Sequence, residues 1–323
     1  MSESITNYDV IIIGGGPAGL SASFWCHELG LRSILFEKEA ELGGQLLWTY
    51  NPITNYPGVE AANGSELRDR FLHHTANRHG RHILQDPVVA SDLQAKSVET
   101  ASGKEYCAKA IIIATGVRRR KLNIPGEDEF YGKGILESGA KDRNQVAGKT
   151  VLIVGGGDAA LENALILGET AAKVYVVHRR GDLTARHEFI SASKANPKIV
   201  FLTNTTLISI EGNKIVERVG IRRKRPVESK KLLVDAVLVR IGVQPNSEIF
   251  RDQVALDAAG YFITERNCAT NIDGIFAIGD ISSPLAPTIA SSAGNGATVA
   301  KVIRDLLTPA NARLIGHSAL KHI

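Results

Sequence analysis

The sequence of 323 residues predicts an α/β protein made of two similar three-layer domains, one inserted into the other. Two glycine-rich turns, GGGPAG and GGGDAA, each lie between an apolar strand pattern and a helical pattern. The spacing between the first glycine of the turn and the end of the second strand is 23 positions in both units, from Gly14 to Glu37 and from Gly155 to His178. Each half of the chain then closes on a similar apolar strand, AIIIATG in the first and AVLVRIG in the second.

The first half predicts a strand at Tyr8–Ile13, a helix that runs to about Leu29 and a second strand at Ser33–Phe36. A β-rich stretch at 83–108 follows, and the closing strand lies at 110–116. The strand–glycine turn–helix–strand order is typical of Rossmann-like domains that bind dinucleotides.

The second half repeats this plan from Thr150, with a β-rich stretch at 199–233 and a hairpin turn at Glu211-Gly212-Asn213. A final block predicts a strand at Gly274–Ile278 and a helix from about Thr288 to Leu307. We therefore expect one domain from residues 1–117 and 248–323, and an inserted domain from residues 118–247.

Composition and charge exclude several other classes of protein. Hydrophobic residues make up 44% of the chain, which is enough for packed cores and argues against a disordered protein. The net charge of +4 is small for a nucleic-acid binder, and no apolar run approaches the roughly 18 residues that span a membrane. No signal peptide and no metal-ligand spacing is visible, so we expect a cytoplasmic protein without a metal.

The first glycine turn suits a doubly negative pyrophosphate that must approach the backbone closely. Gly14 permits the tight turn, Gly16 leaves room for the phosphate, and Gly19 lets the helix pack on the strand. The helix N-terminus adds a positive dipole end. Glu37 is placed to accept hydrogen bonds from a ribose with free hydroxyls, which suits the adenosine of FAD.

The second glycine turn differs where the ligand's ribose is expected. Ala160 replaces the third glycine, and basic residues stand where the first unit has its acid. Guanidinium groups bind a 2′-phosphate and a carboxylate would repel it, so this site suits NADPH over NADH. A solvated basic turn is the alternative interpretation. The residues predicted to contact NADPH are Gly155, Gly157, Asp158, Ala159, His178, Arg179, Arg180 and Arg186.

Two further signals support FAD in the domain formed by residues 1–117 and 248–323, called the outer domain below. Asp280 ends a strand just before a helix, where a carboxylate can hold a ribityl hydroxyl, although an ordinary turn aspartate is the alternative. Ala114-Thr115-Gly116 ends the closing strand of the first half. We expect the N-terminus of the helix near Thr288–Ala290 to stabilise a negatively charged reduced flavin.

Together, these residues resemble the low-molecular-weight thioredoxin reductase family of flavoproteins. The resemblance covers nearly the whole chain and rests on GGGPAG, GGQL, TNYPG, ATG, GGGDAALENA, HRR and GIFAIGD. It implies FAD in the outer domain, NADPH in the inserted domain and a homodimer. The residues predicted to contact FAD are Gly14, Gly16, Pro17, Ala18, Gly19, Glu37, Lys38, Gly44, Gln45, Leu46, Tyr50, Asn55, Ala114, Thr115, Gly116, Gly279, Asp280, Thr288, Ile289 and Ala290.

The sequence departs from that family at the redox-active Cys-x-x-Cys, which the family places just before the second glycine turn. By register, Ser138 and Lys141 occupy the two cysteine positions. The three cysteines of the chain lie elsewhere, at Cys26, Cys107 and Cys268, and we expect inert thiols there. The sequence therefore predicts that thioredoxin is not reduced by the family's route.

A sister group that lacks the cysteine pair is similar to this sequence, namely the thioredoxin-reductase-like ferredoxin/flavodoxin–NADP(+) reductases. In that group an aromatic ring stacks on the flavin at the position of Tyr50, although a core aromatic is the alternative here and Trp48 is another candidate. Arg186-His187-Glu188 resembles a segment of that group. The tail 308–323, with His317, is similar to an extension that covers the flavin, or is a terminus without a role.

These observations predict an NADPH-dependent FAD reductase for ferredoxin or flavodoxin, an acidic one-electron carrier, with Tyr50 and His317 as catalytic stacking residues. The basic runs at 118–121 and 222–225 could steer such a carrier, or are solvated surface charge. One alternative is an NADPH-dependent flavin oxidoreductase with another acceptor, such as a quinone, oxygen or an external disulfide partner. Another is a non-catalytic redox sensor that binds both cofactors.

Overall fold

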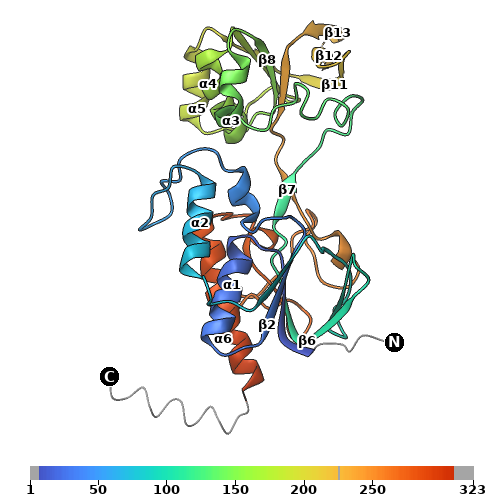
Figure 1. The fold of residues 1–323 in the computed structure, drawn as a ribbon. Helices are drawn as coiled ribbons and strands as arrows, with labels where there is room; N and C mark the ends of the chain where they lie inside the picture. Colours follow the sequence, from blue (N-terminus) through green and yellow to red (C-terminus); the bar gives the residue numbers. More distant parts are fainter. Residues whose placement is uncertain (1–6, 225, 309–323) are drawn as a thin grey trace. The chain divides into compact units, whose positions relative to one another are not determined.

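The computed structural model describes residues 7–224 and 226–308, which form two compact units (Figure 1). Unit 1 comprises Met1–Arg118 with Gln244–Ile323, and unit 2 comprises Arg119–Val243. The chain passes between them through two short strands that pair with each other, β7 (Val117–Arg119) and β15 (Val243–Pro245). Unit 2 is thus inserted into unit 1, in agreement with the predicted arrangement of two α/β domains, one inserted into the other.

Unit 1 is built on a seven-stranded sheet with the order β3-β2-β1-β6-β5-β4, in which β16 also pairs with β6. The long strand β6 has parallel β1 along one edge; on the other, its first residues pair with antiparallel β5 and its last with parallel β16. The strands are β1 (Asn7–Ile13), β2 (Ser33–Glu37), β3 (Arg81–Leu84), β4 (Val88–Asp92), β5 (Ser97–Thr100), β6 (Glu105–Ile113) and β16 (Ile275–Ala277).

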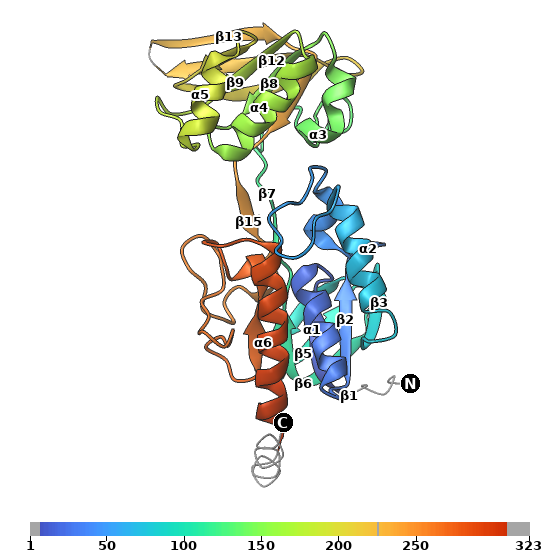
Figure 2. The same ribbon diagram turned by 90° about the vertical axis from the view of Figure 1, so that its left-hand side faces the viewer.

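Two helices, α1 (Pro17–Glu28) and α6 (Ile289–Leu307), lie side by side on one face of this sheet (Figures 1 and 2). Strand alternation divides the core, because Val10 and Ile12 pack towards these helices whereas Ile11 and Ile13 pack on the opposite face. The remaining elements of unit 1 are α2 (Gly64–His74) and the short 3-10 helices η1 (Gly44–Trp48), η3 (Glu248–Phe250) and η4 (Gly279–Ile281).

Unit 2 has three layers: helices, a parallel sheet of order β10-β9-β8-β14, and an antiparallel sheet of order β11-β12-β13. Val151 and Ile153 of β8 pack on α4, whereas Leu152 and Val154 pack on the antiparallel sheet. The elements are α3 (Gly139–Asp142), η2 (Arg143–Val146), β8 (Thr150–Val154), α4 (Asp158–Thr170), β9 (Lys173–Val177), α5 (His187–Ala195), β10 (Ile199–Leu202), β11 (Thr205–Gly212), β12 (Val216–Lys224), β13 (Val227–Leu233) and β14 (Ala236–Val239).

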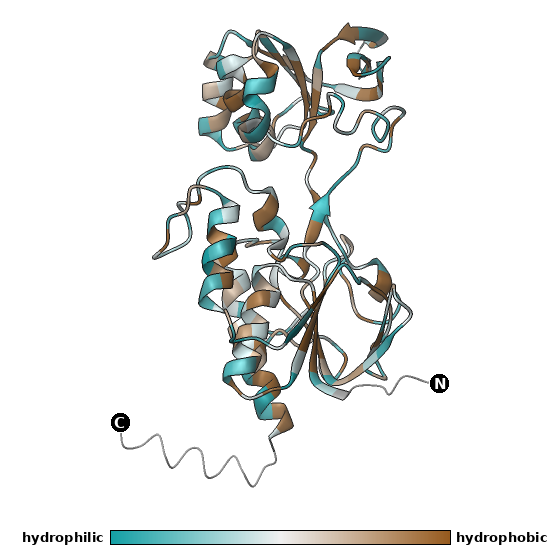
Figure 3. Ribbon diagram, viewed as in Figure 1, coloured by the Kyte–Doolittle hydropathy of each residue, from teal (hydrophilic) through white to brown (hydrophobic). Residues whose placement is uncertain are grey.

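The hydropathy of the chain follows this layering: the central strands in Figure 3 are mainly brown, whereas the exposed helix α2 is mainly teal. The predicted hairpin is confirmed, because β11 ends at Gly212 and β12 begins at Val216. The closing strand, predicted at 110–116, begins and ends earlier: β6 spans Glu105–Ile113 and includes Cys107, because its first residues pair with β5. Helix α2 was not predicted, since it is largely polar.

Candidate functional site

The first glycine turn joins the end of β1 to the start of α1. Gly14 has φ +109°, and a Cβ there would lie 2.4 Å from the carbonyl oxygen of Ala114. A Cβ on Gly19 would lie 1.9 Å from the carbonyl oxygen of Gly14, so the helix packs closely on the turn. By contrast, the nearest atom to a Cβ on Gly16 is 3.9 Å away. The turn is therefore tight at both ends and open in the middle, where a phosphate would approach.

Glu37, at the end of β2, is buried and faces this turn. Its Oε2 accepts a hydrogen bond from the backbone N–H of Gly15 at 2.7 Å, and its Oε1 accepts one from the N–H of Glu39 at 3.0 Å. A carboxylate can accept about four hydrogen bonds, so two positions remain for ligand hydroxyls. Glu37 thus orients the turn and keeps acceptor capacity.

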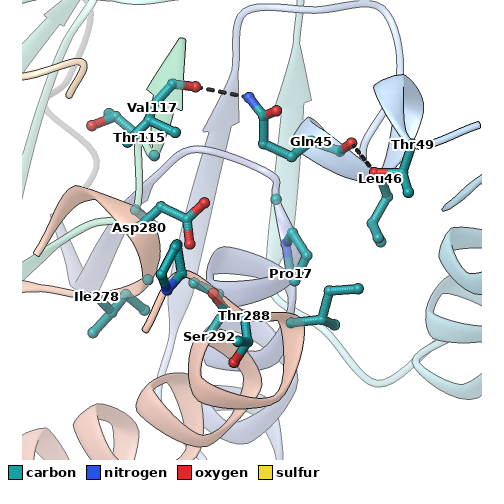
Figure 4. A pocket seen from close by; sticks show the side chains of 17 residues that line it. Pro17, Gln45, Leu46, Thr49, Thr115, Val117, Ile278, Asp280, Thr288 and Ser292 are labelled. Atoms are coloured by element: carbon teal, nitrogen blue, oxygen red, sulfur yellow. Dashed lines mark hydrogen bonds between the residues drawn. The ribbon is translucent and has the colours of Figure 1, made fainter. Parts of the chain in front are cut away.

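A cavity of ≈ 220 Å³ opens beside the first glycine turn. The starts of α1 and α6, the helix η1 and the segments that follow β6 and β16 enclose it (Figure 4). Its lining residues are Gly16, Pro17, Ala18, Gln45, Leu46, Thr49, Ala114, Thr115, Gly116, Val117, Ile278, Gly279, Asp280, Pro287, Thr288, Ile289 and Ser292.

The cavity lies at the point where the strand order of unit 1 reverses. From β1 the chain proceeds to β2 and β3 on one side, whereas β6 and β16 lie on the other. In open parallel sheets, ligands bind outside the carboxyl ends of the strands at this switch point. The topology and the glycine turn therefore indicate the same location for a dinucleotide.

Polar groups enter the cavity from several elements. In Figure 4 the carboxylate of Asp280 lies between Thr115 and Pro17, and burial raises the pKa of this carboxyl. Gln45 Nε2 donates to the carbonyl oxygen of Val117 at 2.7 Å and so connects η1 to the start of β7. The hydroxyl of Thr288 caps α6 by accepting from the N–H of Ser291 at 3.1 Å.

The structure brings together twelve of the residues predicted for FAD in this cavity. They are Gly16, Pro17, Ala18, Gln45, Leu46, Ala114, Thr115, Gly116, Gly279, Asp280, Thr288 and Ile289. The other predicted residues do not line it: Gly14, Gly19, Glu37, Lys38, Gly44, Tyr50, Asn55 and Ala290. The tail with His317 lies outside the described residues.

Five lining residues escaped the sequence analysis: Thr49, Val117, Ile278, Pro287 and Ser292. Ser292 could have been found from helical periodicity, because it follows Ile289 by three positions, whereas the predicted Ala290 is exposed. The other four adjoin predicted motifs.

The second glycine turn joins β8 to α4 in the same manner. Gly155 has φ +154°, and a Cβ there would lie 2.2 Å from the carbonyl oxygen of Arg240. His178 packs behind the turn, since its Nδ1 would lie 2.3 Å from a Cβ on Gly156. Burial, followed by the charge of Arg180, lowers the pKa of His178. His178 therefore occupies the position that Glu37 has in unit 1 and supports the turn as a buried neutral ring.

The three predicted arginines differ in how their side chains are held: two are exposed, and the third is paired with a carboxylate. Arg179 and Arg180 follow β9 and are exposed. Arg186 is held at the start of α4, because its Nε and its backbone N–H each donate to the Asp158 carboxylate at 2.7 Å. The bond from the backbone N–H of Arg186 is the main reason that the pKa of Asp158 lies below its ordinary range.

The segment at the family's cysteine positions forms a helix cap in this chain. The hydroxyl of Ser138 accepts from the N–H of Lys141 at 3.1 Å and starts α3. The Lys141 ammonium pairs with the carboxylate of Glu137. The buried carboxylate of Asp142 accepts from the N–H groups of Glu137 and Ser138 at 2.7 and 3.0 Å. This network has no redox-active group.

The three cysteines do not line the cavity either. Cys26 and Cys268 are buried, and burial raises the pKa of Cys26 to about 12. Burial also raises the pKa of Cys107 and that of Cys268. High thiol pKa values disfavour the reactive thiolate.

Within residues 7–224 and 226–308, no group of three or more His, Cys, Asp or Glu residues could hold a metal ion. No helix in this part of the chain is long and apolar enough to cross a membrane.

The fold and the two glycine turns define a dinucleotide-binding oxidoreductase with an inserted second domain. The family model of the pyridine nucleotide-disulphide oxidoreductases matches residues 8–299, and the chain belongs to this family. FAD and NADPH are therefore the cofactors.

Similar proteins cover almost the whole chain. A thioredoxin reductase of Peptoclostridium acidaminophilum is 35% identical over 91% of this chain and 95% of its own length. The thioredoxin reductase of Bacillus subtilis is 34% identical over 92% and 94%. The crystal structure of Lactococcus lactis thioredoxin reductase, 31% identical, matches 92% of this chain and 98% of its own with a TM-score of 0.81.

These comparisons correct one prediction. A ferredoxin or flavodoxin acceptor, and with it an acidic electron-carrier partner, is wrong, because relatives of this similarity are named thioredoxin reductases. That prediction rested on Ser138 and Lys141 in place of the family's two cysteines, and on the resemblance of Tyr50, Arg186-His187-Glu188 and the tail 308–323 to the sister group. The absence of the two cysteines changes the chemistry of one short helix, α3, whereas the similarity to thioredoxin reductases extends over about 300 residues.

Proposed function

We propose that the protein is an NADPH-dependent FAD reductase whose electrons pass to a disulfide carried by a partner of the thioredoxin class. The overall reaction is balanced when NADPH and one proton convert the disulfide into two thiols and NADP+. The observation that carries the proposal is the pair of glycine turns, one facing the carboxylate of Glu37 and the other followed by Arg179 and Arg180.

The residues of unit 1 fit FAD. The open space at Gly16 admits a phosphate, Glu37 retains acceptor positions for ribose hydroxyls, and Asp280 offers a further carboxylate inside the cavity. Bound FAD would supply the chemistry of accepting a hydride and releasing electrons. The capped N-terminus of α6, at Thr288, would stabilise negative charge on the flavin.

The residues of unit 2 fit NADPH. Arg179 and Arg180 are exposed beside the glycine turn and supply guanidinium groups for a 2′-phosphate. Arg186 is anchored by Asp158, which holds its charge close to the N-terminus of α4. His178 keeps the turn in shape from behind.

The external disulfide follows from the chemistry of α3 and of the cysteines. Ser138 and Lys141 are linked in a helix cap, and the raised pKa of each thiol keeps it protonated. Both sulfur atoms of the reaction are therefore assigned to the acceptor. The stacking roles of Tyr50 and His317, a homodimer and a cytoplasmic location stay predictions.

The test is an anaerobic titration of the purified flavoprotein. NADPH is added first, and bleaching of the flavin absorbance is expected. Oxidised thioredoxin is added next, and return of the flavin absorbance with formation of two thiols per NADPH is expected. Ser138→Ala is the matched control, because it alters the cap without touching either nucleotide site.

Two results would contradict the proposal. If NADPH does not bleach the flavin, the protein is not a reductase and the sensor alternative gains support. If NADPH bleaches the flavin but oxidised thioredoxin does not restore its absorbance, the acceptor is not a disulfide of the thioredoxin class.

A further inference from the structure

The side chains of two arginines, one of which follows β14, donate to the same backbone carbonyl oxygen. Arg240 directly follows this strand, and its Nη2 donates to the carbonyl oxygen of Glu137. Arg119 donates to the same oxygen from its Nη1 at 2.6 Å. The Nη1 of Arg240 donates to the carbonyl oxygen of Val239 at 2.9 Å. The side chains of Arg119 and Arg240 are thus held in place by neutral acceptors.

The positive charge of Arg240 is only partly compensated. Burial, followed by the charge of Arg119, lowers the pKa of Arg240 to about 10. Asp142 and Glu162 act in the opposite sense, but their effect is smaller. A partly buried cation whose pKa is lowered gains stability from an approaching anion.

The position of Arg240 in the sheet indicates which anion could reach it. In the order β10-β9-β8-β14, the strands β9 and β14 flank β8, which ends in the second glycine turn. Arg179 and Arg180 follow β9, whereas Arg240 follows β14. Neighbouring strands are about 4.8 Å apart, so β9 and β14, which lie on opposite sides of β8, are about 10 Å apart.

Arg240 also touches the turn directly through its backbone. Its carbonyl oxygen is the atom that a Cβ on Gly155 would meet at 2.2 Å, and its N–H donates to the carbonyl oxygen of Val154 at 2.7 Å. The residue is therefore adjacent to the place where the pyrophosphate of a dinucleotide is expected.

We propose that Arg240, assisted by Arg119, binds the pyrophosphate of NADPH, whereas Arg179 and Arg180 bind its 2′-phosphate. This inference rests on the proposed function and adds a second phosphate-binding group to the NADPH site. Because the pyrophosphate is common to NADPH and NADH, Arg240 contributes affinity without selecting between them.

The test separates the two phosphate contacts by the choice of ligand. Isothermal titration calorimetry on the flavoprotein uses NADP+, NAD+ and 2′-AMP, of which the last has the 2′-phosphate but no pyrophosphate. Arg240→Met is expected to weaken NADP+ and NAD+ about tenfold or more each and to leave 2′-AMP unchanged. Arg240→Lys is expected to weaken them less, because it keeps the charge.

Two control variants test whether the effect is specific to Arg240. Arg179→Ala with Arg180→Ala is expected to weaken NADP+ and 2′-AMP but not NAD+. Arg223→Ala removes an exposed cation of β12 and is expected to change none of the three affinities.

The inference is overturned if Arg240→Met binds NADP+ like the unchanged protein. It is also overturned if 2′-AMP weakens in parallel with NADP+, because Arg240 is then only a brace for the fold. Failure of the proposed function has a different signature: the unchanged protein itself would bind no NADP+.

Discussion

Glu37→Gln replaces one oxygen of a buried carboxylate by an NH2 group that cannot accept a hydrogen bond. The carboxylate accepts from the N–H groups of Gly15 and Glu39 at 2.7 and 3.0 Å, so the amide can satisfy only one of them. An unsatisfied buried donor costs about 1–3 kcal/mol. For a domain of roughly 200 residues, each kcal/mol lowers Tm by about 2–4 °C, so we expect a decrease of about 2–12 °C.

The assay is thermal unfolding of flavin-free protein, together with the FAD content of the purified protein. We expect both to fall, because Glu37 shapes the turn and is predicted to bind the ribose. Glu39→Gln is the matched control: its side chain is exposed, and only its backbone N–H contributes to the network. An unchanged Tm and full FAD content in Glu37→Gln would refute the role assigned to this carboxylate.

Three further predictions concern the same sites. Gly19→Ala places a methyl group 1.9 Å from the Gly14 carbonyl oxygen and is expected to lower the Tm of flavin-free protein, whereas Gly16→Ala is expected to keep this Tm and lose FAD; equal Tm values for the two variants would contradict this. Arg179→Ala with Arg180→Ala is expected to reduce the kcat/KM preference for NADPH over NADH about tenfold or more in flavin reduction, and a retained preference would show that the 2′-phosphate site is misplaced. Burial raises the pKa of Asp280 above its ordinary value of 3.8, so its contribution to stability is present below pH 3.8 and is lost as the pH rises through the folded-state pKa. Asp280→Asn is therefore expected to raise the Tm of flavin-free protein at pH 7 but not below pH 3.8. Thermal unfolding is measured across this pH range, and a Tm difference between the variant and the unchanged protein that does not vary with pH would disprove the prediction.

The repeated order of strand, glycine turn, helix and strand was predictable from the sequence, because each element has a local period or a local steric requirement. Strand β1 and helix α1 lie where the apolar run and the glycine turn predict them. Helix α2 escaped prediction because its mainly polar surface carries a weak apolar pattern.

Twelve of the seventeen residues that line the cavity could be derived from motifs, but their assembly into one site depends on pairing across the chain. The parallel pairing of β1 with β6 brings Ala114 to the turn at Gly14, although the two residues are 100 positions apart. Helical periodicity then selects Ser292 and turns Ala290 outward. The contact between Ala114 and Gly14 is not contained in any local pattern, because it depends on the pairing of strands that are distant in the sequence.

The electron acceptor was predicted wrongly, because the prediction gave too much weight to the residues at two positions. The substitution of two cysteines at Ser138 and Lys141 is visible in the sequence, but it does not identify the partner. The similarity of nearly the whole chain to thioredoxin reductases overruled that inference. In the structure, Ser138 and Lys141 are joined in a helix cap.

The sequence by itself determined the order of the elements, the two nucleotide-binding turns and the opposite charges beside them. These properties depend on spacing and on residue chemistry over about 25 positions. Only the tertiary structure decided that His178 lies behind its turn and that Arg240 lies beside the same turn. Both outcomes follow from the packing of parallel strands, whose carboxyl ends meet at one edge regardless of their separation along the chain.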